Sequence, residues 1–63
     1  MILAVDTRSQ TWAKAPTIKQ AKQALRKEGG TAKNANLYTI PDDYYLDEMG
    51  IGHGSKLAVR IDK

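Results

Sequence analysis

A histidine and a serine lie close together in the C-terminal stretch MGIGHGSKLAVRID, among three alternating glycines. With an acid, His53 and Ser55 have the side chains that nucleophilic catalysis requires, but no motif supplies an oxyanion hole. The glycines do not form a dinucleotide fingerprint, because those glycines stand between a strand and a helix and these precede a strand pattern. The stretch predicts a turn in which Gly50, Gly52 and Gly54 take positive φ angles, and no enzyme.

Metal binding is the second chemistry that the residue types raise. His53 is the only histidine and there is no cysteine, so a transition-metal site would have to recruit carboxylates alone. Four acids lie just upstream, and their spacing is not that of a calcium loop. They are Asp42, Asp43, Asp47 and Glu48. We expect them at the start and on the solvated face of a short helix, with no metal and no cofactor.

Basic residues concentrate in the first half of the chain. Residues 1–36 hold seven basic and two acidic residues, whereas residues 37–63 hold three basic and five acidic ones. A basic patch is typical of a protein with a polyanionic partner. The predicted DNA contacts are Lys14, Lys19, Lys22, Arg26, Lys27 and Lys33.

A helix over residues 17–28 would position most of these cations. Thr17 and Gln20 have the spacing of a capping box, and two glycines follow Glu28 as a stop signal. The inward side is predicted to comprise Ile18, Ala21, Ala24 and Leu25. Lys19, Lys22 and Arg26 then form a basic strip on the flank of the helix.

The other elements read as three strands and a second, short helix. Strands are predicted over residues 2–8, which would be central in the sheet, over 37–41, and over 56–62. Residues 9–16 are expected to be a connection that folds Trp12 onto the core, and residues 42–50 a short helix. The fold class is therefore α/β (α+β), a small three-stranded sheet in the order β-α-β-α-β.

The last strand has the clearest pattern in the chain. Leu57, Val59 and Ile61 alternate with polar or small residues and are predicted to point inward. The outward set is Lys56, Ala58, Arg60 and Asp62.

The length of 63 residues predicts a single domain, 1–63, with a small core. No stretch has the pattern of a signal peptide or a membrane helix, so we expect a cytoplasmic protein without a membrane partner. A core this small would gain from strands shared in a homodimer.

Residues 37–62 resemble the AbrB-like swapped-hairpin family of DNA-binding regulators, found among antitoxins and bacterial transition-state regulators. The resemblance rests on Ile40-Pro41, Met49-Gly50-Ile51, Gly54-Ser55, Leu57, Val59 and Ile61. It implies a DNA-binding regulator. The segment before Gly50 is one residue longer than in the family, and Ser55 replaces an acid. Acids stand where the family has basic residues, so no DNA-contact role is carried over to them.

Two functions therefore remain open. The first is a small, non-enzymatic DNA-binding protein of transcription regulation, with phosphate contacts from the basic helix and only weak sequence reading unless Gln23 or Asn34 reaches base edges. The second is a protein-binding module of a phage or mobile element that inhibits a host enzyme or defence complex. Its surface would comprise Asp42, Asp43, Tyr44, Tyr45, Asp47 and Glu48.

Overall fold

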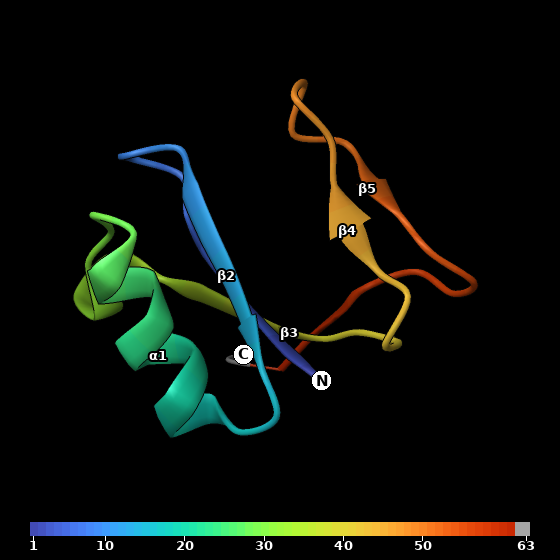
Figure 1. Cartoon of the computed structure of the whole chain (residues 1–63), viewed down its shortest axis with the longest axis horizontal. Coiled ribbons are helices and arrows are strands. Elements are labelled where there is room, and N and C mark those ends of the chain that lie inside the picture. The colour runs from blue at the N-terminus through green and yellow to red at the C-terminus, as the bar shows by residue number, and fades with distance from the viewer. Residues whose placement is uncertain (62–63) are drawn as a thin grey trace.

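The computed structural model describes residues 1–61 as a sheet with a helix on one face and a small hairpin on the other (Figure 1). The elements are β1 (Ile2–Asp6), β2 (Thr11–Ala15), α1 (Ile18–Lys27), the 3-10 helix η1 (Ala32–Asn34), β3 (Asn36–Thr39), β4 (Tyr45–Leu46), β5 (Gly52–His53) and β6 (Val59–Arg60). The main sheet is antiparallel in the order β2-β1-β3-β6, and β4 pairs with β5. The α+β class and the central position of β1 are confirmed.

The predicted order β-α-β-α-β is wrong at residues 9–16. Five of these residues form β2, an edge strand that pairs along its whole length with β1, so the sheet has four strands. The side chains of Ala13 and Ala15 are buried against α1, while Trp12 lies on the other face and is half-buried. The inward face of β2 is alanine and its outward face carries the tryptophan, so a hydrophobicity pattern could not reveal the strand.

The predicted helix over residues 42–50 is also wrong, because this segment forms β4 and a tight turn. Asp47 accepts hydrogen bonds from the backbone N–H groups of Met49 (2.9 Å) and Ile51 (3.0 Å). Gly50 has a φ of +77°, which reverses the chain toward β5. An aspartate that bonds to backbone N–H groups just ahead of it favours a turn over a helix.

The main helix is confirmed at both ends. Thr17 is its N-cap, and the Thr17 hydroxyl accepts from the backbone N–H of Gln20 at 3.2 Å. Gly29 follows with a φ of +95°, the left-handed conformation that ends many helices. Leu25 and Ala21 are fully buried, but Ile18, predicted to face inward, is 43% exposed at the open end of the helix.

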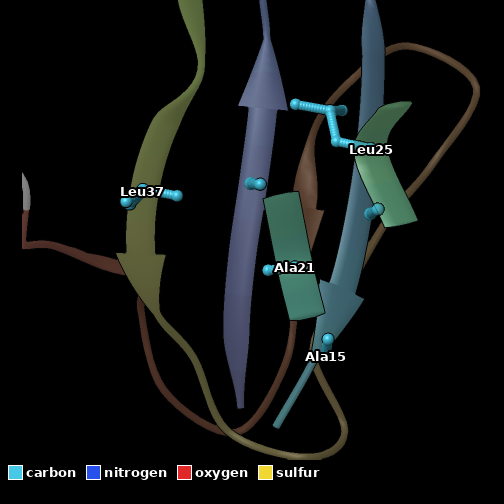
Figure 2. Packing of buried hydrophobic residues seen from close by; sticks show 6 residues of the cluster. Ala15, Ala21, Leu25 and Leu37 are labelled. Carbon is cyan, nitrogen blue, oxygen red and sulfur yellow. The ribbon is translucent and has the colours of Figure 1, made fainter. Parts of the chain in front are cut away.

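The core lies between α1 and strands β1 and β2. Figure 2 shows Ala21 and Leu25 over these strands, with Leu37 on β3 to one side. The strand pairing aligns Ala13, Ala4, Leu37 and Ile61 in one row on this face of the sheet. The first three are at most 7% exposed, but Ile61 is 39% exposed. The helix therefore leaves the β6 side of the sheet uncovered.

The inward prediction for the last strand is wrong for this reason. Leu57 is 88% exposed and Val59 is 62% exposed, and β6 is a two-residue edge strand beside β3. A period of two identifies which residues share a face but not whether another element covers that face. Asp62, predicted to face outward in the same strand, lies outside the described residues.

A buried carboxylate joins the β1–β2 turn to the chain that follows α1. Asp6 accepts from the backbone N–H (2.9 Å) and hydroxyl (3.2 Å) of Thr31, and from the backbone N–H groups of Arg8 (3.0 Å) and Ser9 (3.3 Å). These bonds, that of the Thr31 backbone foremost, lower the pKa of Asp6 to about 2. The charged side chain is only 1% exposed, and its bonds satisfy it there.

Candidate functional site

Five basic side chains gather on the outer side of α1 and beside its C-terminal end, and we call them the basic surface. They are Lys19, Lys22, Arg26, Lys27 and Lys33. The helix places the first three on successive turns of one flank, and η1, which contacts α1, adds Lys33. Arg26 and Lys27 lie in the last turn, where cations interact favourably with the helix dipole.

The basic surface is open, and the acid nearest to it in the chain is Glu28, which is exposed directly after Lys27. Lys22 is half-buried and the other four side chains are exposed. Residues 18–27 include no aspartate or glutamate. Within residues 1–61, the ion pairs are Met1 with Asp42 and His53 with Asp47, and neither involves the basic surface. Its five cations are therefore available to an external anion.

The structure separates Lys14 from the other predicted DNA contacts. Lys14 alternates with the buried Ala13 and Ala15, so its side chain lies on the face of the sheet opposite α1. There its ammonium group donates to the backbone carbonyl of Tyr44 at 2.7 Å. Lys14 attaches the hairpin to the sheet, a role that sequence reasoning missed because β2 was taken for a connection.

Two of the four predicted interface acids hold the hairpin together. Asp43 accepts from the backbone N–H (2.9 Å) and the hydroxyl (3.1 Å) of Ser55. Asp47 lies 2.8 Å from Nε2 of His53, and this contact, with the backbone bond from Ile51, lowers the pKa of Asp47. His53 and Ser55 thus bond to different carboxylates. Asp42 and Glu48 remain exposed.

The adjacent tyrosines have opposite environments. Tyr45 is 51% exposed, and its ring stacks on that of His53 with centroids 5.0 Å apart. Tyr44 is half-buried and lies against the backbone of β5. A Cβ on Gly52 would overlap the Tyr44 phenol group, and one on Gly54 would lie 2.9 Å from the Tyr44 ring. The prediction of positive φ is confirmed for Gly50 alone, and the other two glycines make room for Tyr44.

The hairpin covers its face of the sheet loosely. A cavity of about 400 Å³ lies between the two, lined by Leu3 and Tyr38 from the sheet and by Tyr44 and Leu46 from the hairpin. A second, of about 550 Å³, separates the β1–β2 turn from the 47–50 turn. Within residues 1–61, no three histidine, cysteine, aspartate or glutamate side chains group as metal ligands.

No helix within the described part of the chain has the length and apolar character needed to cross a membrane. Comparison with known proteins found no matching family model, no matching curated protein and no matching solved structure. The resemblance to swapped-hairpin regulators therefore stays a prediction.

Proposed function

We propose that the basic surface binds the phosphate backbone of DNA and that the protein is a small, non-enzymatic DNA-associated regulator. The observation that carries the proposal is the set of five cations on α1 and η1 that no acid within residues 1–61 neutralises. Lysine and arginine contacts to phosphates supply most non-specific affinity for DNA. A helix with such a face is therefore suited to bind a nucleic acid.

The position of the acids supports this assignment. Asp47 and Glu48 lie in the turn between β4 and β5, and Asp42 and Asp43 lie just before β4; the hairpin lies across the sheet from α1 (Figure 1). Interactions between exposed charges fall off over a Debye length of about 8 Å at physiological salt. The acids therefore repel a phosphate at the basic surface only weakly.

The dimensions of α1 suit a DNA groove. Its ten residues span about 15 Å, and the major groove, about 12 Å wide, admits a helix. Gln23 is exposed among the cations, and a glutamine can form two hydrogen bonds with the edge of an adenine. The amide of Asn34, the other predicted base contact, instead donates to the Thr31 hydroxyl at 3.2 Å. Gln23 is thus the better candidate for sequence discrimination.

The proposal is tested by fluorescence anisotropy with mixed-sequence duplex DNA over about 50–200 mM salt. Three or more phosphate contacts give a slope of log affinity against log salt steeper than about −2.7. The variant Lys19→Gln/Arg26→Gln should make that slope shallower by about 1.8, because it removes two contacts. Binding should weaken similarly on different sequences.

A matched control removes two exposed cations outside the basic surface. Arg8→Gln/Lys56→Gln makes the same change in net charge, and both residues are exposed. This variant should keep the wild-type slope. An equal loss in both double variants would mean that net charge alone attracts DNA, and no binding at the lowest salt would contradict the proposal.

The hairpin supports protein inhibition as a second candidate function. Met49 is 82% exposed and Ile51 is 56% exposed, in the same hairpin that exposes Tyr45. Asp47 fixes this turn through three hydrogen bonds, and large exposed side chains on a rigid frame are typical of interaction hot spots. If this candidate is correct, Tyr45→Ala/Met49→Ala should abolish partner capture and Lys19→Gln/Arg26→Gln should not.

A further inference from the structure

The free edge of β2 borders an open groove between the sheet and the helix. The groove has a volume of about 500 Å³ and is lined by residues 10–14 and by Ala24 and Glu28. β2 pairs with β1 on one side, and within residues 1–61 no strand lies on its other side. An exposed edge of five residues offers backbone groups to which another strand can bond.

The strand pairing shows which backbone groups point into that groove. The carbonyl of Met1 accepts from the N–H of Ile40, so the backbone N–H and C=O groups of the odd-numbered residues near the start of β1 point toward β3. The even residues of β1 therefore bond to β2, and Ala4 exchanges its bonds with Ala13. Because the direction alternates along a strand, the backbone N–H and C=O groups of Trp12 and Lys14 point away from β1, toward the free edge of the sheet.

We propose that a second copy of this chain occupies the groove, with the two β2 strands paired antiparallel about a two-fold axis at Ala13. Three registers use the outward groups of Trp12 and Lys14. In the first register Lys14 lies opposite Lys14 of the other copy, and the two like charges repel each other. In the second register the two Trp12 residues lie opposite each other, and Lys14 lies opposite Gln10. The register centred on Ala13 pairs Trp12 with Lys14 twice, so the Lys14 ammonium group, which donates one hydrogen to the Tyr44 carbonyl, can also contact an aromatic ring of the other copy.

The same register brings the two helices to packing distance. A two-fold axis between antiparallel strands keeps both α1 helices on one face of the joined sheet. Each helix lies over the space between its β1 and β2. The two helix axes are then two strand spacings apart, and with a spacing of about 4.8 Å this is roughly 10 Å. Helices normally pack 8–10 Å apart when the side chains between them are small.

The side chains at this helix contact are complementary. Ala24 lines the groove and is small enough for close approach. The helices run antiparallel, so Gln20, one turn before Ala24, meets Glu28 of the other copy, one turn after it. The glutamine amide can donate to that carboxylate. The basic strip lies on the opposite flank of α1, so the dimer does not depend on DNA binding and does not cover that strip.

The first experiment measures molar mass by sedimentation equilibrium from about 1 μM to about 1 mM protein. The wild-type chain should reach twice its monomer mass. Ala24→Glu places a carboxylate at the helix contact next to its own copy, and should weaken the dimer by about a hundredfold. Gln23→Glu makes the same change in charge on the exposed side of α1 and should alter the dissociation constant by less than about twofold.

A cysteine at the two-fold axis gives a second test that does not depend on the stability of Ala24→Glu. The chain has no cysteine, and Ala13 would face Ala13 of the other copy about 4.5 Å apart between Cα atoms. That separation permits a disulfide. Ala13→Cys should become a covalent dimer in a glutathione redox buffer, much faster than Thr39→Cys, which replaces an exposed residue of β3. A monomeric wild-type mass at about 1 mM, or equal cross-linking of both cysteine variants, would overturn the proposal.

Discussion

The two faces of the sheet are covered in different ways. On one face, α1 buries Ala21 and Leu25 completely against the alanines of β1 and β2. On the other, the hairpin is attached by the bond between Lys14 and the Tyr44 carbonyl, and open cavities remain beneath it. Apolar contact holds the first layer, whereas the second buries Leu3 and otherwise depends on polar bonds and loosely packed apolar contacts.

This difference predicts which part of the chain opens locally without global unfolding. A region with few buried apolar contacts opens at a lower free energy than the core. Hydrogen exchange should therefore be slow in α1 and β1 and faster in β4 and β5. The following variants test that contrast, in order of expected effect.

Leu25→Ala should have the largest effect, because this side chain is 0% exposed at the centre of the helix layer. Removing a fully buried leucine lowers the free energy of unfolding by about 2–5 kcal/mol. Urea unfolding followed by circular dichroism measures the change. Ile18→Ala, at a position 43% exposed on the same helix, should lose less than about 1 kcal/mol. Equal losses would contradict a core centred on Leu25.

Acid should weaken the helix layer next, through Asp6. Its pKa is about 2 in the folded chain, below the ordinary value of 3.8, so the folded state binds fewer protons than the unfolded state between these values. The stability that Asp6 contributes is complete above about pH 4 and is lost as the pH falls toward 2. Urea midpoints measured from pH 5 to pH 2 should show this decline. In the same pH series, Asp6→Asn should have a lower urea midpoint at pH 5 than the wild-type chain, and its midpoint should change less with pH.

Gly52→Ala should dislodge the hairpin layer, because the new Cβ overlaps the Tyr44 phenol group. Overpacking of this kind costs about 1–3 kcal/mol. Hydrogen exchange should accelerate in β4 and β5 and stay unchanged in α1. In a Tyr44→Ala background the same substitution should cost much less, because the overlap is gone. A full additional loss in the double variant would show that Gly52 is required for another reason.

Lys14→Met should have the smallest effect of the four. It keeps most of the aliphatic stem and removes the 2.7 Å bond to the Tyr44 carbonyl, which is worth about 1–2 kcal/mol. The hairpin amides should again exchange faster, and the urea midpoint should fall by less than it does in Gly52→Ala. Lys56→Met, at an exposed lysine, is the matched control and should leave exchange unaltered. Faster exchange in α1 after Lys14→Met would mean that the two layers open together.

The sequence allowed prediction of the elements whose signals are local. Thr17, Gln20 and the glycine pair define α1 through its own backbone bonds, and the first strand shows as an apolar run. β2 was missed because its buried residues are alanines. The side chains of the last strand were predicted to point inward because alternation does not reveal whether another element covers that face of the sheet. A single ten-residue helix does not cover all four strands.

The part of the candidate site that depends on local spacing was predicted, and the part that depends on distant contacts was not. Lys19, Lys22 and Arg26 share a flank as a consequence of helical spacing, which can be calculated from sequence alone. The positions of Lys14 and Tyr44 depend on a contact between residues thirty positions apart, which no local pattern indicates. The one available signal was the pair Gly52 and Gly54, eight and ten residues after Tyr44, since glycines that no turn requires allow a ring to approach the backbone.

Because the sheet lies between the basic helix and the acidic hairpin, the molecule has an electric dipole moment directed through the sheet (Figure 1). In the field of a polyanion such a molecule experiences a torque as well as an attraction. The torque turns α1 toward the anion before any side chain makes contact, so a larger share of collisions begins with the basic surface facing the anion.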